Sequence, residues 1–298
     1  MKQKLFGIQM AILIGAGILA LTGCTKEGAI TVSDEDIIQT LIQEDFAPWF
    51  EFTEIYQGDS TDEGSYQLQG MPSDTFAYVI AWWRRITDLS RTVEITIHND
   101  TANVTLTREI TGVLNLIVTN DTFPPDSVVH LTKPLHDTGT RYARFVRTGP
   151  PSAPHRGWTL DAISDVEIHS DNPTIVIDSL RIQGGTYDTV VTNPLSLRSR
   201  EDVFAFAPGT PVTVTAYVSN PPEAVVYLHY NNAMHMHHRS RFTYLPEEGV
   251  FVGTWTTPAL PGVYHAGVDV LRIATLKTDD YPYDSNGWFF VYRVVATP

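Results

Sequence analysis

Apolar and polar residues alternate through the last two thirds of the chain, and this period of two constrains the fold more than any other feature. Val93, Ile95 and Ile97 are separated by polar residues, and similar short runs recur toward the C-terminus. Alternation of this kind is typical of strands that bury one face. Turn-forming pairs such as Asn99-Asp100 and Pro261-Gly262 separate the runs. Because the chain has a single Cys, no internal disulfide can hold these strands, and the sequence predicts a β-rich fold stabilised by apolar cores.

Residues 33–172 combine two predicted helices with several long strands. Ser33 followed by three acidic residues resembles a helix N-cap with favourable charges in the first turn. A second helix is predicted from Ser73, with Trp83 on its apolar face and Trp82 at its rim. Gly112 is expected to mark a bulge or bend in a later strand. The apolar face of this second helix would comprise Phe76, Val79, Ile80, Trp83 and Ile86.

Residues 173–298 show almost no helical periodicity. Seven or eight strands in about 125 residues favour a β-sandwich. The predicted strands are Ile175–Ile182, Val203–Phe206, Val212–Val218, Ala224–Tyr230, Arg241–Leu245, Val250–Thr256, Gly262–Leu271 and Trp288–Val295.

Two segments resemble known families. The segment 157–164, Gly-Trp-Thr-Leu-Asp-Ala-Ile-Ser, resembles the last strand of the nuclear-transport-factor-two-like, or cystatin-like, cone superfamily. The segments 249–255 and 260–264 resemble late strands of bacterial immunoglobulin-like modules. Together the resemblances imply an α+β cone-shaped antiparallel sheet with N-terminal helices over residues 33–172. An all-β immunoglobulin-like sandwich would follow over residues 173–298.

The N-terminus resembles the leader of a bacterial lipoprotein. Lys2 and Lys4 precede a mostly apolar run over residues 5–21, and Leu21-Thr22-Gly23-Cys24 resembles a lipobox. The resemblance implies a signal peptide over residues 1–23, cleavage before Cys24, and fatty chains such as palmitate on Cys24. Residues 24–32 would then form a lipidated tether, and the two or three chains would anchor the protein stably to a membrane. Thr25 stands where Asp would resemble an inner-membrane retention signal, so the outer membrane is favoured over the inner one.

A small-ligand pocket and a basic surface are the first candidate sites. Trp82, Arg84 and Arg85 could clamp a ligand through cation–π contacts and hydrogen bonds. Arg144 belongs to a basic island that could receive an anionic ligand in an otherwise acidic chain. The alternative interpretation is a packed core edge with solvated charges.

A histidine cluster is the second candidate site. His235 and His237 would project to the same side of a strand, close enough to share a metal ion. His238 is a third potential ligand, although its side chain must point away from His237 on a strand, in which case His229 would have to replace one of them. The alternative interpretation is an exposed loop with a local histidine bias, and no cofactor is expected besides the lipid on Cys24.

Charge and motifs narrow the classes of function. The formal net charge of −14 argues against a nucleic-acid partner, which requires clustered positive charge. Motifs of common hydrolases, metalloproteases and nucleotide-binding proteins are missing from the sequence. We therefore expect a membrane-anchored lipoprotein of the bacterial cell envelope with a binding or scaffolding role, whose partner is a protein or a glycan. Two alternatives stay open, namely a pocket-based acid–base enzyme in the first part and a metal-handling lipoprotein that uses the histidine cluster.

Overall fold

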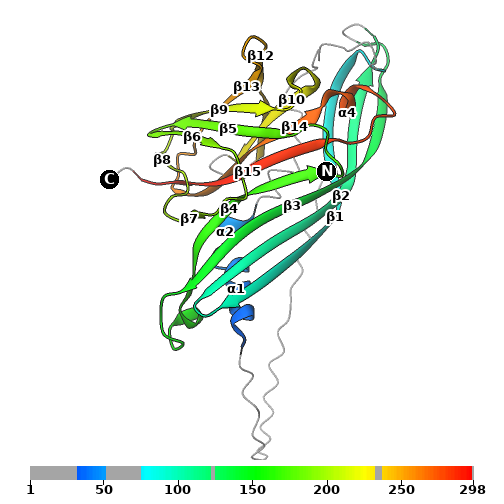
Figure 1. Ribbon diagram of the computed structural model, residues 1–298. Coiled ribbons are helices and arrows are strands. Elements are labelled where there is room, and N and C mark those ends of the chain that lie inside the picture. The colour runs from blue at the N-terminus through cyan, green and yellow to red at the C-terminus, as the bar shows by residue number, and fades with distance from the viewer. Residues whose placement is uncertain (1–31, 52–74, 122–124, 232–236, 297–298) are drawn as a thin grey trace, which may run out of the picture. The chain divides into compact units, whose positions relative to one another are not determined.

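The computed structural model describes residues 32–51, 75–121, 125–231 and 237–296. Residues Ser33–Pro298 form one compact unit built mostly from antiparallel strands in two sheets (Figure 1). Three short α-helices lie among the described residues, α1 (Asp34–Gln43), α2 (Ala47–Phe50) and α4 (Ile273–Lys277), with two short 3-10 turns, η1 (Pro154–Gly157) and η2 (Pro221–Glu223).

The larger sheet has ten strands in the order β1-β2-β3-β4-β15-β14-β10-β11, with β7 beside β4 and β8 beside β15. Its strands are β1 (Tyr78–His98), β2 (Thr101–Thr119), β3 (Val129–Arg147), β4 (Trp158–Ser170), β7 (Arg198–Ser199), β8 (Ala205–Phe206), β10 (Ala224–Asn231), β11 (His237–Arg241), β14 (Gly262–Arg272) and β15 (Ser285–Val294). The smaller sheet has the order β12-β13-β9-β5-β6. Its strands are β5 (Ile177–Gly184), β6 (Tyr187–Val191), β9 (Pro211–Val218), β12 (Thr243–Leu245) and β13 (Val250–Thr256).

The predicted first helix is confirmed. Asp36 donates its backbone N–H to the Ser33 hydroxyl at 3.1 Å, and its carboxylate accepts the Ser33 N–H at 3.1 Å. This reciprocal pair is a capping box, which satisfies two backbone donors that the first helical turn leaves without partners. The stripe that includes Ile38, Leu41 and Ile42 is buried, as its helical spacing predicts.

The predicted second helix is wrong, because residues 78–98 form strand β1. The pairing of β1 with β2 shifts twice, between Val79 and Ala81 and between Ile86 and Asp88, so each site carries one extra residue in β1. An extra residue resets the alternation of a strand. Val79 and Trp82 are therefore both buried, whereas the predicted helix placed Trp83 on its buried face and Trp82 at its rim.

Gly112 lies at the second of these bulges, opposite Ile86. A Cβ atom at Gly112 would stand only 2.2 Å from the carbonyl oxygen of Arg85. The irregularity expected at Gly112 is therefore present, although the extra residue belongs to β1, and only glycine permits this approach of the two backbones.

The larger sheet continues across the predicted boundary between residues 172 and 173. Strand β15 pairs with β4, with Phe289 opposite Val166, and β14, β10 and β11 follow. One face of β10, β14 and β15 covers the smaller sheet and the other face lies inside the curl of β1–β4. Because these strands are buried on both faces, they consist of nearly continuous apolar residues, as in Trp288–Tyr292.

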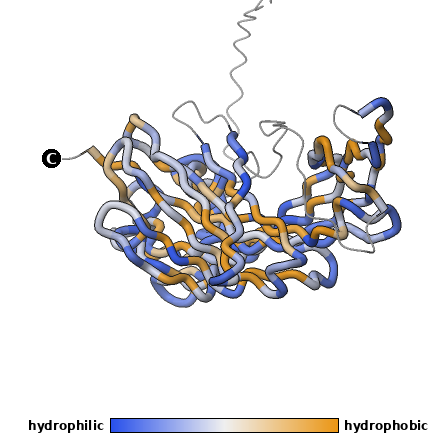
Figure 2. Tube along the Cα trace, turned by 90° about the horizontal axis from the view of Figure 1, so that it is seen from above, coloured by the Kyte–Doolittle hydropathy of each residue, from blue (hydrophilic) through white to orange (hydrophobic). Residues whose placement is uncertain are grey.

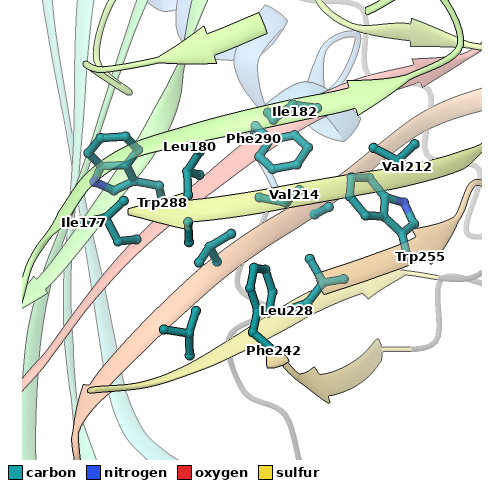
Figure 3. Packing of buried hydrophobic residues seen from close by; sticks show 14 of the residues in the cluster. Ile177, Leu180, Ile182, Val212, Val214, Leu228, Phe242, Trp255, Trp288 and Phe290 are labelled. Carbon is teal, nitrogen blue, oxygen red and sulfur yellow. The ribbon is translucent and has the colours of Figure 1, made fainter. Parts of the chain in front are cut away.

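The main core lies between the two sheets. Figure 3 shows Ile182 and Val214 of the smaller sheet packed with Leu228 and Phe290 of the larger sheet. In the hydropathy view, orange stretches run through the middle of the trace and blue stretches lie mostly at its periphery (Figure 2). The two sheets thus pack face to face. The buried residues of the alternating strands in the second part form the core between them.

Two further cores fill the curl of the larger sheet. One lies toward α4 and contains Trp82, Leu116 and Phe289, and the other lies toward α1 and α2 and contains Phe50 and Phe145. The curl brings the first and last strands of the sheet order together, since Arg239 of β11 donates to the carbonyl oxygen of Trp82 in β1 at 3.1 Å.

Buried arginines hold α2 at the mouth of the curl. Arg141 donates to the carbonyl oxygen of Trp49, and Arg108 donates to that of Phe50 at 3.2 Å. These carbonyls lie at the C-terminal end of α2, where cations are favourable. Burial lowers the pKa of Arg141 to about 9 and that of Arg108 to about 10.

Candidate functional site

A buried ion pair joins β1 to β14 inside the curl. Arg84 donates from both terminal nitrogens to the carboxylate of Asp269, at 2.7 and 3.0 Å. Their side chains are only 2% and 1% exposed. A bidentate pair of this kind is among the strongest polar contacts a protein makes, provided that both charges stay paired.

The pair determines the charge state of Asp269. Burial alone would raise the pKa of Asp269, but the charge of Arg84 and the contacts with His229 outweigh it and lower the pKa well below its usual value. The carboxylate therefore stays ionised at every physiological pH, and it holds the guanidinium of Arg84 in place.

A tyrosine extends this network toward the surface. The Tyr283 hydroxyl accepts from Arg84 Nε at 2.9 Å and donates to Asp137 at 3.0 Å. Ser285 donates to the same hydroxyl at 2.7 Å. Burial raises the pKa of Tyr283 strongly, so its proton stays on the hydroxyl and available to Asp137.

Trp82 packs next to this network, with the guanidinium of Arg84 5.4 Å from its ring centroid. Its indole N–H donates to the Tyr227 hydroxyl at 3.1 Å, and the guanidinium of Arg239 lies 3.9 Å from its ring centroid. Trp82 is 2% exposed. The ligand clamp predicted from Trp82 and Arg84 is thus occupied by the protein's own side chains, and these side chains link β1 to β10, β11 and β14.

The histidines divide between two faces of β10 and β11. His237 stacks on His229, with Nδ1 of His229 3.0 Å from Nε2 of His237, whereas His238 stacks on Tyr230. His229 also contacts Asp269 at 3.3 Å. His235 lies outside the described residues, and within those residues no group of three potential ligands converges on one point.

Burial keeps the His229–His237 pair neutral. Burial lowers the pKa of His229, and burial together with the neighbouring groups, among them Arg239, lowers that of His237 to about 2. Two neutral imidazoles can share one hydrogen bond. Their nitrogen separation of 3.0 Å therefore suits a hydrogen bond in which one neutral imidazole donates its N–H to the other.

The remaining predicted residues lie apart from this network. Arg85 points outward and is exposed. Arg144 lies on β3, where its side chain is 42% exposed and donates to Asp161 at 2.6 Å. Cys24 lies outside the described residues. The sequence grouped Arg85 with Trp82 and Arg84, but in the structure Arg85 is exposed whereas Trp82 and Arg84 are buried.

A surface pocket of about 250 Å³ adjoins the buried network. It is lined by residues 134–136 of β3, residues 171, 172 and 174 after β4, and residues 281–284 before β15. Tyr283 belongs to both the pocket and the network. We call this opening the Tyr281 pocket, since Tyr281 begins the segment 281–284 that lines one side of it.

Lys133 of β3 holds residues 278–281, at the start of this lining segment, against the sheet. Its ammonium donates to the carbonyl oxygens of Thr278 and Tyr281, both at 2.6 Å. Burial, partly offset by the charges of Asp279 and Asp280, lowers the pKa of Lys133 to about 8. A neutral amine keeps two donors, so both contacts can persist when the proton is lost.

Sequence reasoning missed the partners of Arg84. Asp269 is the only charge within the apolar run of β14, and a lone charge in a strand buried on both faces signals an ion pair. Tyr283 and Asp137 carry no such signal, because each sits among other polar residues.

Comparisons with family models, curated proteins and solved structures found no match. Within the described ranges, every helix is too short or too polar to cross a membrane.

Proposed function

We propose that this protein is a lipid-anchored protein of the bacterial cell envelope with a non-catalytic binding role. The leader with its lipobox at Cys24 supports the anchor. The acidic balance of the chain supports domains that stay off anionic lipid headgroups. The binding partner would be a protein or a glycan of the envelope.

One observation carries the binding role. The charged groups inside the curl are engaged with one another, since Arg84 is held by Asp269 and Tyr283, with distances from 2.7 to 3.0 Å. Side chains held in this way keep the surrounding strands rigid. The Tyr281 pocket lies at the surface next to them, because Tyr283 belongs to both the network and the pocket lining. Preformed concave sites on rigid elements are typical of binding proteins.

The finer fold assignment belongs to the same proposal. We regard residues 33–172 as a cone-like domain and residues 173–298 as an immunoglobulin-like module that shares its sheet. The curled sheet β1–β4 with α1 and α2 at its mouth supports the first assignment, and the packed sheets of the second part support the other.

Localisation and lipid analysis test the anchor. In cells that express the full chain, mass spectrometry of the N-terminal peptide should find Cys24 as the first residue with diacylglycerol on its sulfur. Cys24→Ser should abolish the modification and the processing, whereas the matched Thr22→Ser variant should keep both. An unmodified sulfur on the wild-type chain would refute the anchor.

An acid–base enzyme is the second candidate, although its residues would lie in 173–298 and not in the first part as the sequence predicts, because Asp269, His229 and His237 lie in contact in that order. A carboxylate that orients one imidazole against another group is a common catalytic arrangement. The pKa of His237 separates the two functions, and NMR titration of its ring protons measures it. Burial of His237 lowers this pKa to about 2, whereas an acid–base role needs a value near neutrality.

A further inference from the structure

Arg91 of β1 carries two buried nitrogen atoms, Nε and Nη2, that lack a hydrogen-bond partner among the residues the structure describes. The neighbouring arginines differ, because Arg108 and Arg141 each donate to a backbone carbonyl of α2. A buried donor without an acceptor is unfavourable, and a charged donor is more so. Arg91 therefore has two hydrogen-bonding positions that an acceptor from outside the chain can fill.

Arg91 points into the curl beside another guanidinium group. It lies directly opposite Arg108 in the register of β1 and β2, and Arg108 is 2% exposed. Residues directly opposite one another on paired strands share a face of the sheet, and like charges there repel. The charge of Glu51 acts on both arginines, but its carboxylate is 56% exposed and 3.5 Å from Arg108. One solvated negative charge thus faces two guanidinium groups.

The wider cluster has the same excess of positive charge. Arg141 and Arg198 both act on the buried carboxylate of Asp165. Among the described residues, four guanidinium groups therefore meet two carboxylates at this end of the curl. Burial lowers the pKa of Arg91, and the charge of Glu51 offsets this only in part. An anion is the ligand that supplies the missing counter-charge.

The two open nitrogens of Arg91 select the shape of the anion. Nε and Nη2 lie along one edge of the guanidinium, so their N–H groups fit two oxygens that are bound to the same atom. Arg181 makes this contact within the protein, since its Nε and Nη2 donate to the two carboxylate oxygens of Asp188, both at 2.7 Å. A carboxylate or a phosphate matches this edge, whereas a chloride ion cannot span it.

The apolar side chains beside Arg91 favour a carboxylate with an apolar body. Leu89 and Val93 flank Arg91 on the same face of β1, because their partners in β2, Ile110 and Leu106, are buried in the curl. Leu89 is nevertheless 41% exposed, and Val93 is only partly buried. Methylene groups gain from covering such a surface, whereas a phosphate dianion would lose hydration beside it. Arg91 as a whole is only half-buried, so the group lies near the surface and not deep in a core.

We propose that Arg91 binds a small carboxylate with an apolar body, such as a short-chain fatty acid, at the mouth of the curl. In this arrangement Nε and Nη2 donate to the two oxygens, and Arg108 adds positive charge while it keeps its contact with α2. Leu89 and Val93 contact the methylene groups. The site shares no residue with the Tyr281 pocket and needs no lipid anchor, so it goes beyond the proposed function and is tested separately.

The experiment uses the chain from Ser33, which contains the whole compact unit and all three cores. Calorimetry and the NMR signal of the Arg91 Nε–H group follow titrations with acetate, butyrate, hexanoate and phosphate at constant ionic strength. We expect hexanoate to shift that signal and to bind with a Kd of about 1–10 mM, which suits a ligand of this size. Hexanoate should bind at least about fourfold more tightly than acetate, the gain from burying one methylene group.

Two arginine variants of β1 locate the binding. Arg91→Gln removes the paired donors and should weaken hexanoate binding at least tenfold, while the free protein stays at least as stable as the wild type because a like-charge contact is lost. Arg85→Gln removes an exposed arginine of the same strand and should leave Kd unchanged.

Four results would overturn the proposal. They are a hexanoate Kd above about 100 mM, an Arg91 Nε–H signal that hexanoate leaves in place, an Arg91→Gln variant that binds as the wild type does, and acetate or phosphate binding as tightly as hexanoate. None of these outcomes would bear on the modification of Cys24.

Discussion

Removing the charge of Arg84 should destabilise the protein far more than removing a surface arginine. In Arg84→Met, Asp269 keeps its place at 1% exposure but loses both guanidinium hydrogen bonds. Breaking a buried pair from one side costs about 3–5 kcal/mol, because the remaining charge stays desolvated. Total stability of a typical domain is about 5–15 kcal/mol, so this variant should lose a large fraction of it.

Arg144 provides the matched control. It also pairs with an aspartate at 2.6 Å, but its side chain and that of Asp161 are 42% and 32% exposed. Exposed pairs contribute about 0–1 kcal/mol. Arg144→Met should therefore change the free energy of unfolding by no more than that.

Urea unfolding followed by tryptophan fluorescence measures these differences on the chain from Ser33. The double variant Arg84→Met/Asp269→Leu should be more stable than Arg84→Met, because no charge is left without a partner. If Arg84→Met fails to fold, Arg84→Lys keeps a positive charge and allows the same comparison. Equal losses in Arg84→Met and Arg144→Met, or a double variant no more stable than Arg84→Met, would refute the reasoning.

Three further predictions concern pH and packing. Burial lowers the pKa of Lys133 from 10.5 to about 8, so the unfolded chain binds more protons between these values and Tm should rise with pH across this window. Lys133→Met should flatten that rise in a calorimetric series. The pKa values of His229 and His237 are also lowered, so stability should fall as pH drops below 6.5. In His237→Gln, the free energy of unfolding measured by urea titration should fall less steeply as the pH drops, by up to about 1.4 kcal/mol per pH unit. An unchanged dependence on pH would contradict this. Finally, a Cβ at Gly267 would stand 2.1 Å from the buried ring of Phe289, so Gly267→Ala should cost about 1–3 kcal/mol. Adding Phe289→Leu should restore part of that loss, whereas a fully stable Gly267→Ala would show that the ring can move.

Local patterns predicted the elements wherever local physics decides them. The capping box at Ser33 and the turn at Asn99, whose φ is 55°, depend on neighbours in the chain. The strands of the second part follow from alternation and turn residues in the same way, and strand β13 was predicted at Val250–Thr256, its observed bounds. The second helix was wrong because two bulges interrupt the alternation of β1, and a bulge is visible only against the partner strand.

The sequence by itself determined strands β9, β10, β13 and β14 to within a residue or so, where α1 begins, and that no disulfide could hold the strands together. Only the tertiary structure decided which strands share a sheet, because pairing of β15 with β4 joins residues more than 100 positions apart. The same holds for the site. Arg84 meets Asp269, 185 residues away, since the curl of the larger sheet brings its first strand against its last ones. Alternation specifies the face on which a side chain lies, but the partner on that face depends on how the whole sheet closes.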